Sequence, residues 1–181
     1  MADSPPDSQP RATLYVDGYN IVGSWPELIQ LRDQGDLAAA RDRLRELMVN
    51  YSAYQQFQTH LVFDAYTQAT PAAVEPVTQH LSLHYTDFGQ TADSYIERYC
   101  ARWRSQPGRL IVATSDRAQQ LTVMGYGAEW MSARQLSAEV LATARQHRRR
   151  HHRQTAKRNR LLAHALSPEA QVRLQQMRLG L

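Results

Sequence analysis

The chain has 181 residues and a mass of 20.7 kDa, enough for one substantial hydrophobic core but too short for two ordinary domains and a linker. No run of about 18 apolar residues occurs, so the sequence predicts no membrane-spanning helix. The N-terminal segment also lacks the basic flank and apolar stretch of a secretory signal. The single cysteine, Cys100, excludes an intramolecular disulfide and argues against a cysteine-based zinc site. We therefore expect a reducing compartment: the cytoplasm, or the plastid stroma in a plant or alga.

The charges are unevenly distributed. Residues 1–144 hold 11 basic and 16 acidic residues, whereas residues 145–181 hold ten basic residues and one acid, Glu169. An acidic body is therefore followed by a basic C-terminal segment. All basic residues except Lys157 are arginines, and Lys157 is followed by Arg158, which excludes the Gly-Lys-Ser/Thr triplet of a Walker A loop.

Short β-favouring runs alternate with segments of helical periodicity along the chain. The predicted strands are residues 13–16, 60–63, 81–85, 110–113 and 128–131. The predicted helices are residues 25–31, 37–54, 91–104, 117–124 and 132–165, with a last short helix starting at 167. This alternation predicts βαβ units and an α/β fold with a mainly parallel central sheet. We expect a disordered leader (1–11), an α/β domain (12–144) and a basic helical C-terminal extension (145–181).

Acidic residues stand where predicted strands end. Asp17, Asp64 and Asp116 follow three strands, and Asp93 begins the helix after a fourth. Ligands of parallel sheets bind beyond the carboxyl ends of the strands, so these acids should meet at one edge. Mutual repulsion costs roughly 1–4 kcal/mol per pair near a surface, which a bound Mg²⁺ or Mn²⁺ would offset. Each acid alone also fits a helix N-cap or a turn, and this second interpretation stays open.

Four motifs occur in order around these acids: LYVDGYN at 14–20, VFDA at 62–65, TAD at 91–93 and VATSD at 112–116. With Trp25-Pro26 and the stretch 127–136, they resemble the NYN-domain family of PIN-like nucleases, in particular its YacP-like branch of ribosome-associated endoribonucleases. The resemblance covers about residues 12–165. It implies a PIN-like three-layer fold and metal-dependent RNA hydrolysis. It matches Asp17, Asp93 and Asp116 to the metal-binding acids, and Asn20 and Asp64 to supporting catalytic positions.

The basic segment is the predicted contact for nucleic acid. Residues 145–160 contain seven arginines and Lys157, and no acid lies between Glu139 and Glu169. Such a patch is suited to phosphate contacts, although a solvated helix end would have the same composition. A zinc site from His147, His151 and His152 is opposed by the neighbouring cations. The candidate RNA-binding residues are Arg148, Arg149, Arg150, Arg153, Lys157 and Arg158, with Tyr19 and Arg134 from the body.

The leading hypothesis is a Mg²⁺- or Mn²⁺-dependent endoribonuclease that cleaves single-stranded mRNA, probably at the ribosome, without an organic cofactor or a membrane. The alternative is a non-catalytic RNA- or ribosome-binding module that keeps only the fold. A binding module has no need of mutually repelling acids, so their presence favours the enzyme. A phosphoacceptor receiver domain also gathers acids at strand ends, but it needs a lysine after the last strand, and none occurs there.

Overall fold

The computed structural model describes residues 10–64 and 72–165, with side chains described up to residue 149. Its centre is a six-stranded sheet in the order β3-β4-β2-β1-β5-β6. Every pairing is parallel except that of β3 with β4, which confirms the predicted mainly parallel sheet. The strands are β1 (Ala12–Asp17), β2 (Phe57–Phe63), β3 (Ala73–Thr78), β4 (Leu81–Tyr85), β5 (Leu110–Ala113) and β6 (Glu129–Met131). The helix predicted from residue 167 lies outside the described residues.

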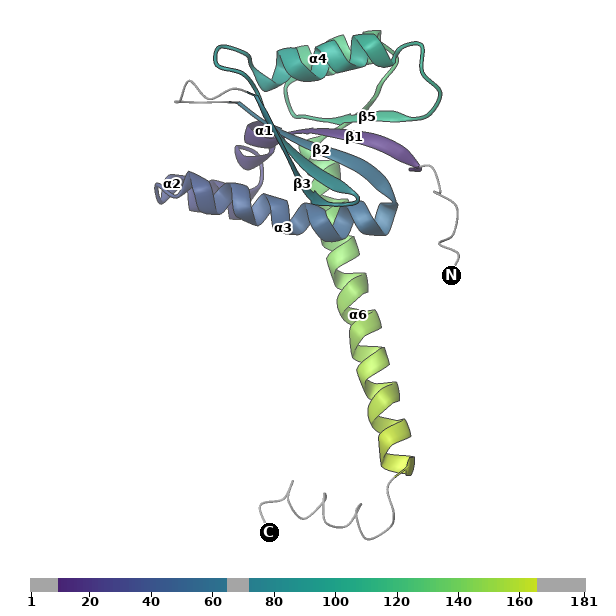
Figure 1. Cartoon of the computed structure of the whole chain (residues 1–181). Coiled ribbons are helices and arrows are strands. Elements are labelled where there is room, and N and C mark those ends of the chain that lie inside the picture. The colour runs from purple at the N-terminus through teal and green to yellow at the C-terminus, as the bar shows by residue number, and fades with distance from the viewer. Residues whose placement is uncertain (1–9, 65–71, 166–181) are drawn as a thin grey trace. The chain divides into compact units, whose positions relative to one another are not determined.

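Helices cover both faces of the sheet, as expected for a three-layer α/β fold (Figure 1). Helix α4 packs on β1, β2 and β5, whereas α3 packs on β2 and β4 from the other side and contacts α1 and α2. The helices are α1 (Gly18–Val22), α2 (Pro26–Asp33), α3 (Leu37–Gln55), α4 (Ala92–Trp103), α5 (Arg117–Gly125) and α6 (Ala133–Ala165).

Two hydrophobic cores lie on the two faces of the sheet. Strand β1 is buried throughout: Leu14 and Val16 belong to the core beneath α3, and Tyr15 belongs to the core beneath α4. Alternate residues of a strand point to opposite faces, so a central parallel strand must be apolar on both. This burial fixes the register of β1 and, with it, the position of Asp17 at the carboxyl edge of the sheet.

Strand β3 was not predicted from the sequence. It is the antiparallel edge strand, it contains Pro76, and most of its residues are exposed. Proline cannot donate to a ladder and is tolerated at sheet edges. A strand with neither an apolar run nor a buried face therefore gives no signal in the sequence.

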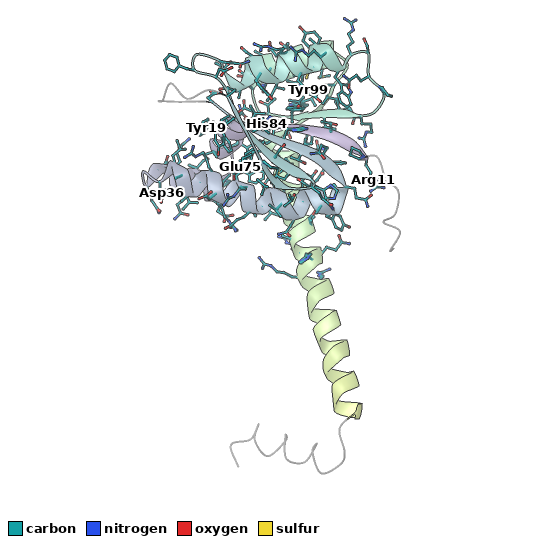
Figure 2. All side chains as sticks on the ribbon, in the orientation of Figure 1. Arg11, Tyr19, Asp36, Glu75, His84 and Tyr99 are labelled. Atoms are coloured by element: carbon teal, nitrogen blue, oxygen red, sulfur yellow. The ribbon has the colours of Figure 1, made fainter. Side chains whose placement is uncertain are left out.

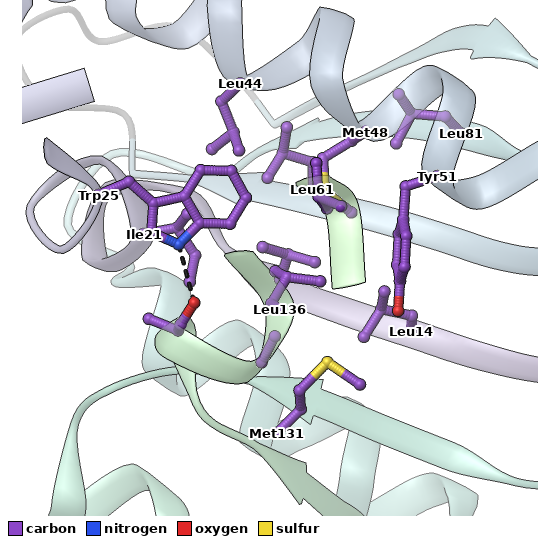
Figure 3. Close-up of a cluster of buried hydrophobic side chains, with 14 of the residues drawn as sticks. Leu14, Ile21, Trp25, Leu44, Met48, Tyr51, Leu61, Leu81, Met131 and Leu136 are labelled. Atoms are coloured by element: carbon purple, nitrogen blue, oxygen red, sulfur yellow. Dashed lines mark hydrogen bonds between the residues drawn. The ribbon is translucent and has the colours of Figure 1, made fainter. Parts of the chain in front are cut away.

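The start of α6 is attached to the sheet domain through Trp25. Figure 3 shows the indole among the buried side chains, with its Nε1–H donating to the backbone oxygen of Ala133 at 2.9 Å. Trp25 is 6% exposed, and Leu136, from the next turn of α6, is fully buried in the same core. One side chain therefore joins the residue before α2 to the first turn of α6.

We expect Trp25→Phe to lower the free energy of unfolding by about 1 kcal/mol, because the ring is largely kept while one buried hydrogen bond is lost. Trp25→Ala should cost more, about 3–5 kcal/mol, because it also leaves a cavity. Urea unfolding followed by circular dichroism measures both values. Equal stability of Trp25→Phe and the wild type would show that the indole N–H contributes nothing.

The chain divides into two compact units between Thr143 and Ala144. The first contains the sheet, the five shorter helices and the first turns of α6. In the second, the described part is the continuation of α6 to Ala165, which holds the basic residues of 145–160. Of the predicted leader, residues 1–9 lie outside the described part, while the backbone N–H of Arg11 donates to Gln56 at 3.0 Å.

Candidate active site

Asp17 is held rigidly at the end of β1. It is the N-cap of α1, its Oδ1 accepts a hydrogen bond from the Asn20 backbone N–H at 3.0 Å, and it is 7% exposed. The next residue must be glycine, because a Cβ on Gly18 would overlap the ring of Phe63. The chain therefore turns tightly at this point and leaves the Asp17 carboxyl group at the sheet edge.

Asp64 and Asp93 approach Asp17 from two other elements. Asp64 directly follows β2, and Asp93 lies in the first turn of α4. The Ala92 backbone N–H donates to Oδ1 of Asp64, which ties the start of α4 to the end of β2. The carboxyl groups of Asp17 and Asp93 lie in hydrogen-bonding contact, and Asp64 acts electrostatically on Asp17. The structure thus brings together three of the four predicted acids.

The environment disfavours the charged form of these carboxyl groups. Burial raises the pKa of Asp17 to about 7 against the opposing Asn20 N–H, and the charges of Asp93 and Asp64 raise it further. Burial also raises the pKa of Asp64, with the Ala92 N–H acting against it and Asp93 acting with it. A proton or a cation in this cluster would relieve the repulsion.

The chemistry of the donor set fits a hard divalent cation. Carboxylate oxygens are the ligands that Mg²⁺ and Mn²⁺ prefer, and the excess negative charge of the cluster is what a cation would neutralise. Asp17 and Asp93 could hold such an ion, with Asp64 alongside. In the described side chains as they stand, no group of three or more acidic, histidine or cysteine residues is already arranged around a metal position.

Asp116 lies at the same sheet edge but is engaged in capping α5. Its Oδ1 accepts the backbone N–H groups of Ala118 at 2.7 Å and Gln119 at 3.0 Å. Both interpretations of this residue from the sequence, cap and metal ligand, concern the same carboxyl group, and the structure shows the cap. Its role as a metal ligand stays a prediction.

Asn20 connects the two halves of this edge. Its Oδ1 accepts hydrogen bonds from the Ser115 backbone N–H at 2.7 Å and from Ser115 Oγ at 2.6 Å, while its own N–H binds Asp17. The residue before Asp116 is thereby attached to the turn after Asp17. Of the two roles considered for Asn20, the structure shows one that positions other residues.

The predicted RNA-binding residues fall into two groups. Tyr19 is half-buried with its ring edge-on to Phe63, at 5.2 Å between centroids, and Arg134 is exposed in the first turn of α6. Arg148 and Arg149 are exposed on α6. Arg150, Arg153, Lys157 and Arg158 also belong to α6, but their side chains lie outside the described part, as do those of His151 and His152.

A buried polar network under α4 was missed by the sequence analysis. His60 Nδ1 lies 3.0 Å from Ser82 Oγ and 2.9 Å from His84 Nε2, and His84 Nδ1 lies 2.9 Å from the hydroxyl of Tyr95, two residues after Asp93. Figure 2 shows His84 and Tyr99 between the sheet and α4. The one available signal was a polar residue at alternate positions of β4. The network attaches the helix that carries Asp93 to the sheet.

This network should make stability depend on pH. Burial lowers the pKa of His60 to about 4, with His84 adding to the effect, and burial also lowers the pKa of His84. The unfolded chain therefore binds protons below pH 6.5 that the folded chain excludes. The contribution of His60 is complete above about pH 6.5 and is lost as pH falls towards 4, on the order of 3 kcal/mol in all.

We expect His60→Gln to flatten the decline in the free energy of unfolding between pH 7 and pH 5. Urea unfolding at several pH values measures the slope in both proteins. The contributions of the carboxyl groups are common to both, so the difference isolates the histidine. Identical slopes would contradict the assignment.

In the part of the chain that the structure describes, no helix is long and apolar enough to cross a membrane. The sequence model of the YacP-like NYN domain matches residues 14–179. The YacP protein of Bacillus subtilis is 35% identical over 138 residues, which are 76% of this chain and 79% of that protein.

Solved structures agree with these matches. The crystal structure of Rae1 (YacP) from Bacillus subtilis covers 93% of this chain and 95% of its own, with 31% identity and a TM-score of 0.70. A mutant form of the same protein covers 80% and 84%, with 33% identity and a TM-score of 0.68. The chain belongs to the family of YacP-like NYN domains, which are nuclease-type domains.

Proposed function

We propose that this protein is a Mg²⁺- or Mn²⁺-dependent endoribonuclease that cleaves single-stranded mRNA at the ribosome. The observation that carries the proposal is the contact between the Asp17 and Asp93 carboxyl groups, beside Asp64, at the carboxyl edge of a parallel sheet in an NYN-type chain.

The residues of the chain have distinct roles in this proposal. Asp17 and Asp93 hold the cation, with Asp116 as a third candidate ligand. A bound Mg²⁺ or Mn²⁺ lowers the pKa of water and stabilises negative charge on a phosphodiester. Asp64 fixes the start of α4 through the Ala92 N–H, and Asn20 fixes the loop before Asp116 through Ser115. The last two act by positioning the acids.

Contact with RNA and ribosome is assigned to the basic segment of α6. Residues 145–160 supply eight positive charges, whereas the body up to residue 144 carries an excess of acids. An acidic body repels a phosphate backbone, so attraction must come mainly from this segment. Action at ribosomes would place the protein in the cytoplasm or in a plastid stroma.

The alternative, a non-catalytic RNA- or ribosome-binding module, explains the basic segment equally well. It does not explain why a carboxyl group that is 7% exposed stays in contact with another carboxyl group. Burying like charges together is unfavourable for folding, and only a function at that point compensates for it.

Cleavage of labelled RNA tests the proposal. Free single-stranded RNA should be cut internally with Mg²⁺ or Mn²⁺, should be left intact with EDTA, and should be cut again when metal is restored. EDTA dissociates ribosomes, so in reactions with translating ribosomes the inactive control is Asp17→Asn. Ribosome-bound mRNA should be cut faster than free RNA. Cleavage in EDTA would contradict the metal dependence, and binding without any cleavage would favour the alternative.

A further inference from the structure

A groove beside the acids has no role in the function described so far. It has a volume of about 560 Å³, within the range of about 300–1,000 Å³ for small-molecule sites. Three parts of the first unit line it: the turn between α1 and α2, the β5–α5 loop, and the first turns of α6. We call it the serine groove, after Ser24, Ser115, Ser132 and Ser137 in its lining.

The serine groove is directly connected to the candidate active site. Ser115, in its lining, precedes Asp116 and donates two hydrogen bonds to the side chain of Asn20. Ser24, also in its lining, donates to the backbone oxygen of Asn20 at 2.7 Å. Asn20 in turn binds Asp17. One residue therefore separates the groove from the buried carboxyl group, and a chain-like ligand with its reacting group at Asp17 passes the groove.

The hydroxyl groups define what the groove can bind. The Ser24 hydroxyl hydrogen is used on Asn20, and Ser115 Oγ donates to Asn20 Oδ1, although the two serine oxygens are only 2.9 Å apart. Each hydroxyl has one hydrogen, so what remains towards the groove is acceptor lone pairs. A ligand there must offer a donor, such as a ribose 2′-hydroxyl or a base amino group.

The other lining residues fit the rest of a nucleotide. Trp25 and Ala133 are buried at the base of the groove, and Leu141 and Ala138 are exposed along its side, which gives apolar surface for the faces of a base. Arg134 is exposed in the lining and forms no ion pair with any carboxylate of the described residues. A free guanidinium beside hydroxyl acceptors suits a phosphate and its ribose.

We propose that the serine groove holds a ribonucleotide adjoining the phosphodiester at Asp17 and Asp93, with its 2′-hydroxyl donating to the Ser24–Ser115 pair and a phosphate contacting Arg134. This rests on the proposed function and makes the groove the place where the protein distinguishes RNA from DNA. An apolar side chain of a ribosomal protein could also enter such a groove. The guanidinium and the link to Asp17 favour the nucleotide.

Filling the groove tests the proposal. Ala138→Trp should raise the Kd for a fluorescent single-stranded RNA, measured in EDTA to prevent cleavage, at least tenfold. The matched control is Ala142→Trp, an exposed position one turn away on the same helix and outside the groove lining. It should stay within twofold of the wild type. Thermal melts show whether both variants fold.

A second pair of variants does not depend on Ala138→Trp folding. Arg134→Gln should weaken RNA binding and lower its salt dependence by about 0.7 log units per log unit of salt, the value for one phosphate contact to a single strand. Arg102→Gln, exposed near the end of α4, should leave both unchanged. Equal salt slopes for Arg134→Gln and the wild type would overturn the phosphate contact.

The 2′-hydroxyl is tested by replacing single ribonucleotides of the RNA with deoxyribonucleotides. One position should weaken binding to the wild type about three- to tenfold, the effect of one hydrogen bond, and should have no effect on Ser24→Ala. If the wild type binds and cleaves RNA while groove variants and deoxy substitutions change nothing, the proposal is overturned and the nuclease assignment stands. If Ala138→Trp loses only ribosome association, the groove binds protein and the proposal is overturned. If the wild type neither binds nor cleaves RNA, both assignments fail.

Discussion

Asp17→Asn and Asp93→Asn should each reduce RNA cleavage at least about a hundredfold while leaving the fold intact. Each substitution removes one of two carboxyl groups in contact, and with it a candidate cation ligand. It also removes repulsion at a buried position, so the melting temperature at pH 8 should stay the same or rise.

Cleavage assays and thermal melts on the same preparations decide this prediction. Asp33→Asn, which changes an exposed carboxylate at the end of α2, is the matched control and should cleave like the wild type. Cleavage by Asp17→Asn or Asp93→Asn at the wild-type rate would remove that residue from the active site. Loss of cleavage together with a large fall in melting temperature would instead indicate a structural role.

Replacing four arginines of the basic segment should have the largest effect on RNA and ribosome binding. The variant changes Arg148, Arg149, Arg150 and Arg153 to alanine. If each contacts one phosphate, the slope of log affinity against log salt should fall by about 3 for single-stranded RNA. Binding of Mn²⁺ should be unchanged, because the acids lie in the other unit of the chain.

RNA affinity at several salt concentrations measures the slope. A control with four arginines of the body changed to alanine separates a local contact from a general loss of charge: Arg45, Arg98, Arg102 and Arg104. If the four-arginine variant keeps the slope of the wild type, the basic segment is not the contact. Arg117 or Arg134, near the acidic edge, would then be the better candidate.

Much of the fold was predictable because buried parallel strands leave a strong pattern. Strands β1, β2, β4 and β5 appear in the sequence as apolar runs bounded by polar turns, and the helices between them imply parallel pairing. Two elements gave no such pattern: α1, which has only five residues, and β3, which is exposed and contains Pro76. The order of the strands depends on contacts between distant segments, which a local pattern does not contain.

The candidate site was predictable in its residues more than in its contacts. Strand ends indicated Asp17, Asp64 and Asp93, because the sheet edge gathers whatever follows its strands. No sequence pattern could show that Asn20 binds Ser115, or that His84 binds Tyr95, since these bonds depend on side-chain positions in the folded chain. Asp116 illustrates the same limit: capping and metal binding place an acid at the same position in the sequence.

Titration of the protein with Mn²⁺, followed by electron paramagnetic resonance of the free ion, tests the central claim most directly, because it detects the cation without requiring a substrate. Wild-type protein should bind Mn²⁺, Asp17→Asn and Asp93→Asn should lose that binding, and Asp33→Asn should retain it. Asp116→Asn in the same titration decides whether that residue is a third ligand. Binding of Mn²⁺ by Asp17→Asn and Asp93→Asn with the affinity of the wild type, or no binding by the wild type, would contradict the assignment of these carboxylates as the metal site of a nuclease.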